Sequence, residues 1–184
     1  VLHQGSPAEI VSMLQTGQAD IGIATEALDT APEIATFPYY QWRHALIVPK
    51  GHPLASLKGL TLKDIAAYPI ITYHEGYTGR GQLDKAFADE GLAPDIVMSA
   101  LDADVIKAYV ELGLGIGIVA SMAYYAERDT NLSLSESEHL FRLNTTLIGV
   151  RRGHYLRGYA YKFIELCAAE HTEAIVRQQA TQLA

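Results

Sequence analysis

The sequence has few of the features that define several common classes of protein. Among its 184 residues there is one cysteine, Cys167, which excludes an internal disulfide framework and a multi-cysteine zinc site. There is no run of about 18 apolar residues, so we expect no membrane span and no membrane partner. The N-terminus lacks the charged-then-apolar layout of a signal peptide. Together these features favour a reducing compartment, and we expect a cytoplasmic protein.

Positive charge is also scarce. The chain has 14 Lys and Arg against 21 Asp and Glu, a formal net charge of −7, and Arg151-Arg152 is its only basic cluster. Because phosphate binding is dominated by clustered cations, these residues do not themselves form a nucleic-acid surface. The hydrophobic fraction of 49% is typical of a domain that buries a core, as one large domain or two small lobes.

No set of residues typical of an enzyme is found. The seven histidines lack metal-ligand spacing, and no Ser-centred nucleophile elbow occurs. Gly113–Gly117 has the glycine spacing of a nucleotide fingerprint, but it follows a predicted helix and precedes a predicted strand, so we interpret it as a tight turn. Cys167 falls within a predicted helix as a buried structural thiol. We therefore expect no catalytic residue, no metal and no cofactor.

The first clear element is a helix that begins after Ser6. Ser6 and Glu9 are spaced as a capping box, Pro7 suits the first helical position, and Gly17 ends the helix. Residues 1–4 are predicted to be part of a strand, and residues 19–24 form a second, largely buried strand. This order predicts a parallel strand-helix-strand crossover.

The rest of the chain alternates predicted strands and helices. A second capping box is expected at Thr61 and Asp64, and residues 33–49 should hold two extended segments broken near Tyr40-Gln41. Strands are expected at 69–72, 95–100 and 116–119, helices at 80–90, 104–112 and from 121, a polar loop at 128–138, extended segments at 139–143 and 145–150, and helices at 155–169 and 172–183.

This order predicts an α/β fold with two Rossmann-like lobes, whose open sheets are rich in parallel strands and are joined by two crossover strands. We expect lobe I to comprise residues 1–40 and 143–184, and lobe II to comprise residues 41–142. Ligands of such folds bind beyond the carboxyl ends of strands and at helix N-termini, which here are expected to face the cleft between the lobes.

Hydroxyl groups stand at three positions of this kind. Ser6 opens a helix, Thr25 ends a strand, and Thr78 precedes Gly79-Arg80 at the start of another helix. Hydroxyls and free backbone N–H groups at helix N-termini suit a small oxyanion, because they donate hydrogen bonds without a full charge. Ser and Thr are also ordinary helix caps, so each position has a purely structural interpretation as well.

Two further side chains have two possible roles each, and two others have a structural role. Trp42, the only tryptophan, lies at the expected lobe boundary and would either cover a ligand or pack in the core or hinge. Arg80 would either pair with an anionic effector or lie on the surface near a helix start. Asp102 and Asp104 flank a helix entrance, and we interpret both as caps.

Several short motifs, taken together, resemble one protein family. They are His3–Pro7, Ala19–Leu28, Thr78–Arg80, Asp102–Lys107 and Leu112–Gly117. With these motifs, the chain from residue 1 to about residue 176 resembles the effector-binding domain of the CysB and Cbl group of LysR-type transcriptional regulators. Regulators of this group control sulfur assimilation and cysteine biosynthesis.

The resemblance implies a two-lobed fold like that of type 2 periplasmic binding proteins, with a small effector in the interlobe cleft. The effectors that it implies are sulfate, thiosulfate, O-acetylserine, N-acetylserine or adenosine phosphosulfate. The positions that match ligand contacts of the group are Ser6, Thr25, Trp42 and Thr78, the last with Gly79 and Arg80 of its motif.

The resemblance also implies partners of the full-length protein. These are DNA, bound through an N-terminal winged helix-turn-helix domain that is absent from this sequence, RNA polymerase, and further copies of the chain in a dimer or tetramer. CysB-like proteins supply further ligand groups from a Thr-x-Thr-Gln segment that is not found here, so we expect the first lobe to be incomplete.

The alternative function is that of a solute-binding protein for a small oxyanion such as sulfate, which would share the fold. The missing signal peptide and the motifs of the CysB and Cbl group argue against it. An α/β enzyme is disfavoured because no acid, base or nucleophile set can be assembled.

Overall fold

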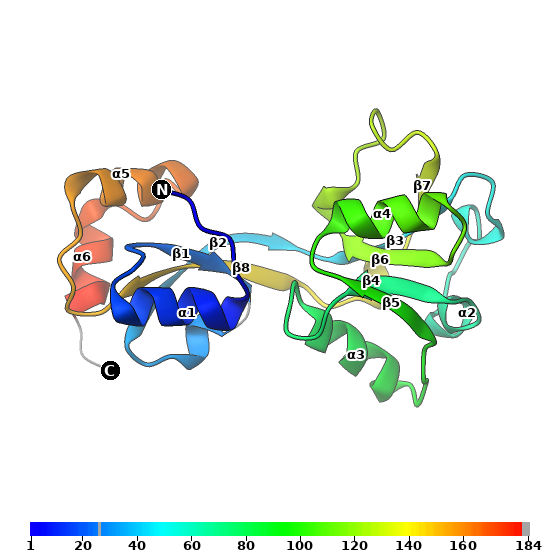
Figure 1. Ribbon diagram of the computed structural model, residues 1–184, viewed down its shortest axis with the longest axis horizontal. Helices are drawn as coiled ribbons and strands as arrows, with labels where there is room; N and C mark the ends of the chain where they lie inside the picture. The colour runs from blue at the N-terminus through cyan, green and yellow to red at the C-terminus, as the bar shows by residue number, and fades with distance from the viewer. Residues whose placement is uncertain (26, 182–184) are drawn as a thin grey trace. The chain divides into compact units, whose positions relative to one another are not determined.

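The structure, a computed structural model, describes residues 1–25 and 27–181 and has an α/β fold (Figure 1). The chain divides into two compact units. Unit 1 comprises Val1–Gln41 and Thr145–Ala184, and unit 2 comprises Trp42–Asn144. Among residues 1–25 and 27–181, no helix is both long enough and apolar enough to span a membrane.

Unit 1 is built on a three-stranded sheet with the order β1-β8-β2. β1 is antiparallel to β8, with Gly22 opposite Gly149. Three α-helices and a short 3-10 helix complete the described part of this unit. Its elements are α1 (Pro7–Thr16), β1 (Gly22–Ala24), η1 (Leu28–Thr30), β2 (Ile34–Trp42), β8 (Asn144–Arg151), α5 (Gly158–Cys167) and α6 (Glu173–Thr181).

The predicted start of α1 is confirmed. The Ser6 hydroxyl accepts a hydrogen bond from the Glu9 N–H at 3.2 Å, and the Glu9 carboxylate accepts from the Ser6 N–H at 2.7 Å. Pro7 occupies the first turn, and Gly17, with φ 75°, ends the helix in the left-handed region. The predicted end of the last helix, Leu183, lies outside the described residues.

The predicted parallel crossover at the start of the chain is wrong. Residues 1–6 form no strand, and Val1 and Leu2 are exposed. The second strand begins at Gly22 rather than at residue 19, because the Ala19 N–H donates to the Met13 carbonyl at 3.1 Å and so belongs to the end of α1. Since β1 pairs antiparallel with β8, its hydrogen bonds come from the far end of the chain.

Unit 2 is built on a five-stranded sheet with the order β5-β4-β6-β3-β7. β4 is parallel to β5 and β6, whereas β3 is antiparallel to β6 and β7. Its elements are β3 (His44–Pro49), η2 (Pro53–Ala55), α2 (Leu62–Ala66), β4 (Ile70–Tyr73), α3 (Arg80–Asp89), β5 (Ile96–Ala100), α4 (Ala103–Glu111), β6 (Ile116–Ala120), η3 (Ser121–Ala123), β7 (Leu132–Leu134) and η4 (Glu138–Leu140).

The expectation of parallel-rich sheets is therefore only partly correct, because this sheet is mixed. Parallel neighbours arise where a helix carries the chain back to the same end of the sheet, as α3 and α4 do. β3 instead follows β2 after the single residue Arg43. Two local predictions are also wrong: the polar loop at 128–138 contains the short strand β7, and residues 139–143 contain part of η4 rather than a strand.

The helix starts of unit 2 are largely as predicted. The capping box of Thr61 and Asp64 forms, and the Asp102 carboxylate accepts from the Val105 N–H at 3.0 Å. Asp104 is not a cap, because its carboxylate pairs with Lys107 at 2.9 Å. The predicted turn at Gly113–Gly117 is confirmed: Gly113 follows α4 with φ 76°, and β6 begins at Ile116.

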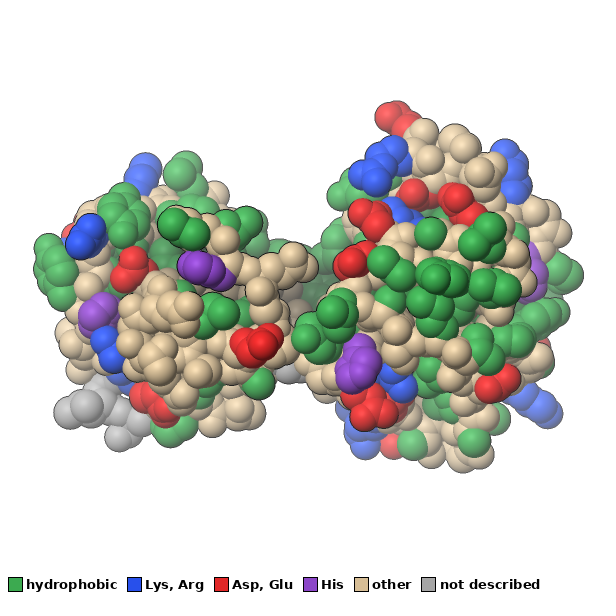
Figure 2. Space-filling model, in the orientation of Figure 1, with side chains coloured by type: hydrophobic (Ala, Val, Ile, Leu, Met, Phe, Trp, Pro, Cys, Tyr) green, Lys and Arg blue, Asp and Glu red, His purple; other side chains and the backbone are tan. Residues whose placement is uncertain are grey.

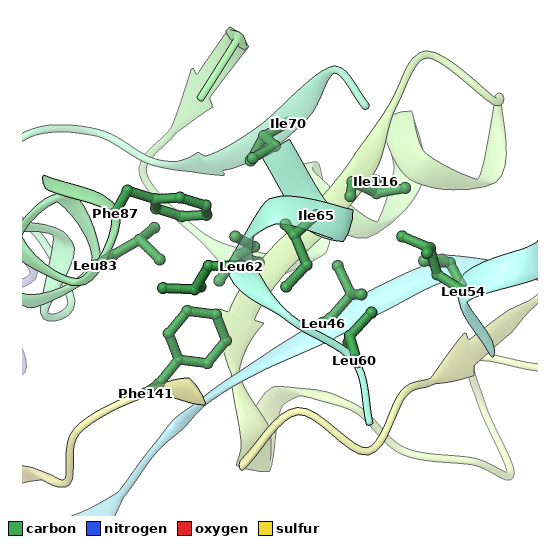
Figure 3. Close-up of a cluster of buried hydrophobic side chains, with 12 residues drawn as sticks. Leu46, Leu54, Leu60, Leu62, Ile65, Ile70, Leu83, Phe87, Ile116 and Phe141 are labelled. Atoms are coloured by element: carbon green, nitrogen blue, oxygen red, sulfur yellow. The ribbon is translucent and has the colours of Figure 1, made fainter. Parts of the chain in front are cut away.

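The sheet of unit 2 is buried on both faces. Leu46 and Val48 of β3 belong to one cluster of buried side chains, and Ile47 between them belongs to another. This alternation follows from the two-residue period of a strand. In Figure 3, Leu46 lies with Ile65, from α2, in the first cluster, which also takes in Phe87 of α3. Burial on both faces explains why these strands are continuous apolar runs.

Apolar side chains also reach the surface of unit 2 around α4 (Figure 2). α4 buries Ile106 and Val110, but it leaves Val105 and Tyr109 more than a third exposed, and Leu112 just after the helix is 73% exposed. The apolar pattern of α4 alone therefore does not show which side faces the core.

A buried ion pair ties α4 to the segment after β6. The Lys107 ammonium, almost fully buried, lies 3.2 Å from the Asp129 carboxylate and donates to the Ala123 carbonyl at 3.0 Å. Asp129 also accepts from the Tyr125 N–H at 2.8 Å. Burial by itself lowers the pKa of Lys107, but its hydrogen bonds to Asp104 and Asp129 outweigh burial and raise the pKa. Lys107 therefore stays charged.

Replacing this lysine should destabilise the protein far more than replacing an exposed one. Lys107→Met leaves the Asp129 carboxylate buried without its counter-ion, and we expect a loss of about 3 kcal/mol in the free energy of unfolding. Lys85 forms an exposed pair with Asp89, so Lys85→Met should cost less than about 1 kcal/mol. Urea unfolding at neutral pH measures both values, and equal losses would contradict the expectation.

Candidate functional site

Unit 2 brings several strand ends and helix starts to one edge of its sheet. The parallel strands β4, β5 and β6 end at Tyr73, Ala100 and Ala120, and α3 and α4 begin shortly after the first two of these ends. This is the edge at which open α/β sheets bind ligands, because backbone N–H groups of the helix starts point there. Thr78 and Gly79 lie at this edge, in the segment that joins β4 to α3.

Thr78 and Gly79 form the centre of a strained turn. The Arg80 N–H donates to the Tyr77 carbonyl at 2.9 Å, and both central residues have positive φ, 43° at Thr78 and 67° at Gly79. Two positive φ angles define a type I′ turn. A β-branched residue rarely adopts this conformation, which costs an L-residue about 1–2 kcal/mol. Strain of this kind concentrates at functional sites.

His44 holds the carbonyl of the strained residue. Its Nε2 lies 3.0 Å from the Thr78 carbonyl oxygen, and because a carbonyl only accepts, Nε2 carries the proton and donates it. The imidazole is 1% exposed and has edge-on ring contacts with Trp42 at 5.1 Å and Phe141 at 5.8 Å. Burial lowers the pKa of His44 to about 4, although the bond to Thr78 opposes the shift. The imidazole is therefore neutral at pH 7.

Gly79 is enclosed by His44 and Asn144. A Cβ atom added to Gly79 would lie 2.7 Å from the Asn144 Oδ1 atom and 2.9 Å from the His44 Cε1 atom. Both contacts are shorter than real Cβ contacts, and the φ of 67° already favours glycine. Sequence reasoning missed both His44 and Asn144. The only signal available for His44 was a histidine at the start of an apolar strand, and Asn144 gave none.

Arg80 is buried rather than on the surface, so that alternative is wrong. Its guanidinium is engaged by the protein itself: Nε donates to the Asp84 carboxylate at 2.7 Å, and Nη1 donates to the Tyr73 carbonyl at 2.6 Å. Arg80 thus ties the end of β4 to the start of α3. The turn also carries the hydroxyls of Tyr77 and Thr78, and the Thr78 hydroxyl has no hydrogen bond among residues 1–25 and 27–181.

Trp42 is buried at 5% exposure, as core packing requires. Its ring lies edge-on to His44, and His44 in turn binds Thr78. Trp42 and the turn therefore both contact one imidazole.

In unit 1 the predicted site residues have partners of their own. The Ser6 hydroxyl is engaged in the capping box and donates to the Glu9 carboxylate at 2.8 Å. The Thr25 hydroxyl lies 3.5 Å from that of Thr146, a buried residue of β8 that sequence reasoning did not identify. In the described part of the chain, no group of three or more His, Cys, Asp and Glu side chains could hold a metal ion.

The family match gives the class of this domain. The LysR substrate binding domain family matches residues 1–172, so the chain belongs to that family. Its relatives are transcriptional regulators, which are not enzymes.

Two relatives show which group within this family the chain resembles. The chain is 55% identical to the HTH-type transcriptional regulator SsuR of Burkholderia cenocepacia over 94% of its length, and 47% identical to CysB of the same organism over 95%. It spans 56% of each relative, so about half of their length is matched. These relatives confirm the resemblance to the CysB and Cbl group and argue against a solute-binding protein.

A solved structure confirms the fold class. The cofactor-binding domain of the Cbl transcriptional regulator matches with a TM-score of 0.93 and 48% identity, over 98% of this chain and 80% of that one. The fold is accordingly that of type 2 periplasmic binding proteins.

The depressed pKa of His44 makes stability depend on pH. The unfolded chain binds a proton near the ordinary pKa of 6.5 and the folded chain only near 4, so the contribution of His44 is complete above pH 6.5 and is lost as the pH falls toward 4. This difference corresponds to about 3 kcal/mol. Between pH 7 and pH 4, the free energy of unfolding should fall by about 3 kcal/mol more in the unmodified protein than in His44→Gln.

Urea unfolding at pH 7, 5.5 and 4 provides the comparison. The carboxylates of the two proteins are the same, so their acid titration cancels in the difference. If the free energies of unfolding of the unmodified protein and of His44→Gln fall by the same amount over this pH range, a neutral, buried His44 is contradicted.

Proposed function

We propose that this chain is the effector-sensing domain of a LysR-type transcriptional regulator of sulfur assimilation and cysteine biosynthesis. The observation that carries the proposal is the match to the cofactor-binding domain of Cbl, at 48% identity and a TM-score of 0.93 over 98% of the chain. SsuR and CysB, at 55% and 47% identity, are transcriptional regulators with the same domain. A domain that binds a small molecule in a regulator of this kind is suited to sensing an effector.

The proposed effector is a small anion or an acetylserine-type molecule: sulfate, thiosulfate, O-acetylserine, N-acetylserine or adenosine phosphosulfate. Thr78 and Gly79 offer a hydroxyl and a helix start, which suit an oxyanion without a full positive charge. Thr25 would add a second hydroxyl from the end of β1, with Ser6 and Trp42 as further contacts. Arg80 would act by holding the Tyr77–Arg80 turn, because its guanidinium is already paired.

The proposed partners concern the full-length protein. Its relatives are named HTH-type regulators, and this chain spans 56% of each, so we place DNA binding in the unmatched part. RNA polymerase and further copies of the chain, in a dimer or tetramer, are the other proposed partners, and the cytoplasm is the proposed location. An effector would act by favouring one of two arrangements of the regulator, through a difference in affinity of about 1–3 kcal/mol.

Calorimetric titration of the full-length protein with the five candidate effectors tests this function. We expect one of them to bind, and Thr78→Ala and Thr25→Ala each to weaken it about tenfold or more, because each removes a hydrogen bond to a charged group. Thr78→Ser and Thr25→Ser keep the hydroxyl and should retain most of the affinity.

Thr16→Ala is the matched control. The Thr16 hydroxyl bonds to the backbone of its own helix, so this substitution should leave the affinity unchanged. If none of the five effectors binds, the proposed effector class is wrong. If one binds and both Thr→Ala variants bind as tightly as the unmodified protein, the threonines do not contact the effector and the assigned site is wrong.

A further inference from the structure

A cavity of about 540 Å³ lies beside the start of β3 in unit 2. β7 pairs with residues 47–49 of β3 and does not extend further along it. The Leu46 N–H instead donates to the Ser137 hydroxyl at 2.8 Å, so a side chain takes the place of the next backbone partner. Arg43 and Ala45 line the cavity at this part of the strand. A volume of this size is typical of sites for small molecules.

Another wall of the cavity is the segment that follows β7. It contributes one apolar and four polar side chains, those of Leu134, Ser135, Glu136, Glu138 and His139. The segment is fixed to the core near both ends. The Ser135 N–H donates to the Leu46 carbonyl at 2.9 Å, and Nε2 of His139 donates to the Leu60 carbonyl at 2.9 Å. The cavity is therefore formed by anchored backbone and does not depend on its charged side chains.

Three charged side chains line this cavity without pairing. Within residues 1–25 and 27–181, none of the ion pairs includes Arg43, Glu136 or Glu138. Arg43 is half-buried, and its Nη1 donates to the Phe141 carbonyl at 2.7 Å. No other hydrogen bond of this guanidinium is found in the described part of the chain, so Nη2 and Nε remain as donors. One cavity thus keeps a cation apart from two carboxylates.

This separation of charge suits a ligand that carries both charges. A guanidinium binds a carboxylate through two N–H groups, and carboxylates accept hydrogen bonds from an ammonium group. An oxyanion such as sulfate would be repelled by the two glutamates, and a simple cation would be repelled by Arg43. In an α-amino acid the ammonium and the carboxylate are held on one carbon atom, so a single molecule satisfies both kinds of partner.

We propose that this cavity is an additional ligand site, which binds an α-amino acid with a free ammonium group and a free carboxylate. Arg43 binds the carboxylate, and Glu136 and Glu138 bind the ammonium. Neither Thr78 nor Thr25 lines the cavity, so the site does not rest on the proposed function. Two isomers among the proposed effectors distinguish this chemistry. O-acetylserine has both charged groups, whereas the acetyl group of N-acetylserine removes the ammonium.

Calorimetric titration of the full-length protein that carries Thr25→Ala and Thr78→Ala tests the site, because this background lacks the hydroxyls of the proposed effector site. In mildly acidic solution the protonated amine of O-acetylserine does not attack its ester, so the two isomers stay distinct. O-acetylserine should bind at least about tenfold more tightly than N-acetylserine. Adding Glu136→Gln and Glu138→Gln together, or Arg43→Gln alone, should weaken O-acetylserine at least about tenfold, because each change removes charge-assisted hydrogen bonds.

Glu111→Gln is the matched control. Glu111 is an exposed glutamate at the end of α4 and does not line the cavity, so its replacement should leave the affinity unchanged. Glu136 and Glu138 are also exposed, so their replacement tests the site even where Arg43→Gln fails to fold. The proposal is overturned if O-acetylserine does not bind in this background, or if the glutamate replacements leave its affinity unchanged. It is also overturned if those replacements weaken N-acetylserine to the same extent.

These results are distinct from those that test the proposed function. If an effector depends on Thr25 and Thr78 while O-acetylserine does not respond to the cavity variants, the proposed function stands and the additional site is wrong. If O-acetylserine depends on the cavity variants and no effector depends on the two threonines, the additional site stands and the assigned effector site is wrong.

Discussion

One buried, neutral imidazole lies where β3, β6 and the turn before α3 meet in unit 2. His44 begins β3 and lies opposite Ala120 at the end of β6. The Ala120 N–H in turn donates to the Tyr73 hydroxyl at the end of β4, at 3.1 Å. From this position His44 bonds to Thr78. The ring stays neutral because it is buried, and its side-chain hydrogen bond joins the start of β3 to the turn that precedes α3.

Features that depend on neighbours in sequence could be predicted. The capping boxes at Ser6 and Thr61 need only a hydroxyl and an acid three residues later, and both form. The start of α3 after Gly79 and the turn after Gly113 follow from glycines that tolerate positive φ. The α/β class followed from the alternation of these elements.

Features that depend on distant residues could not be predicted in this way. β1 pairs with β8, more than 120 residues later in the chain, so its antiparallel direction leaves no trace in residues 1–24. Arg80 has the sequence context of a surface residue, and only the Tyr73 carbonyl and the Asp84 carboxylate account for its burial. His44 and Asn144 are 100 residues apart, and each acquires a role only because Gly79 lies between them. The candidate hydroxyls were therefore visible in the sequence, but the distant residues packed around Thr78 and Gly79 were not.

The strain in the Tyr77–Arg80 turn is small compared with the stability of a folded domain. The left-handed conformation of Thr78 costs about 1–2 kcal/mol, and allosteric coupling by a ligand is typically about 1–3 kcal/mol. A single hydrogen bond from His44, worth about 1 kcal/mol in a folded protein, is of the same size. The strain at Thr78 is therefore within the range that one hydrogen bond from His44 can offset. A more favourable sequence for this turn, such as Asn-Gly, would not carry this strain.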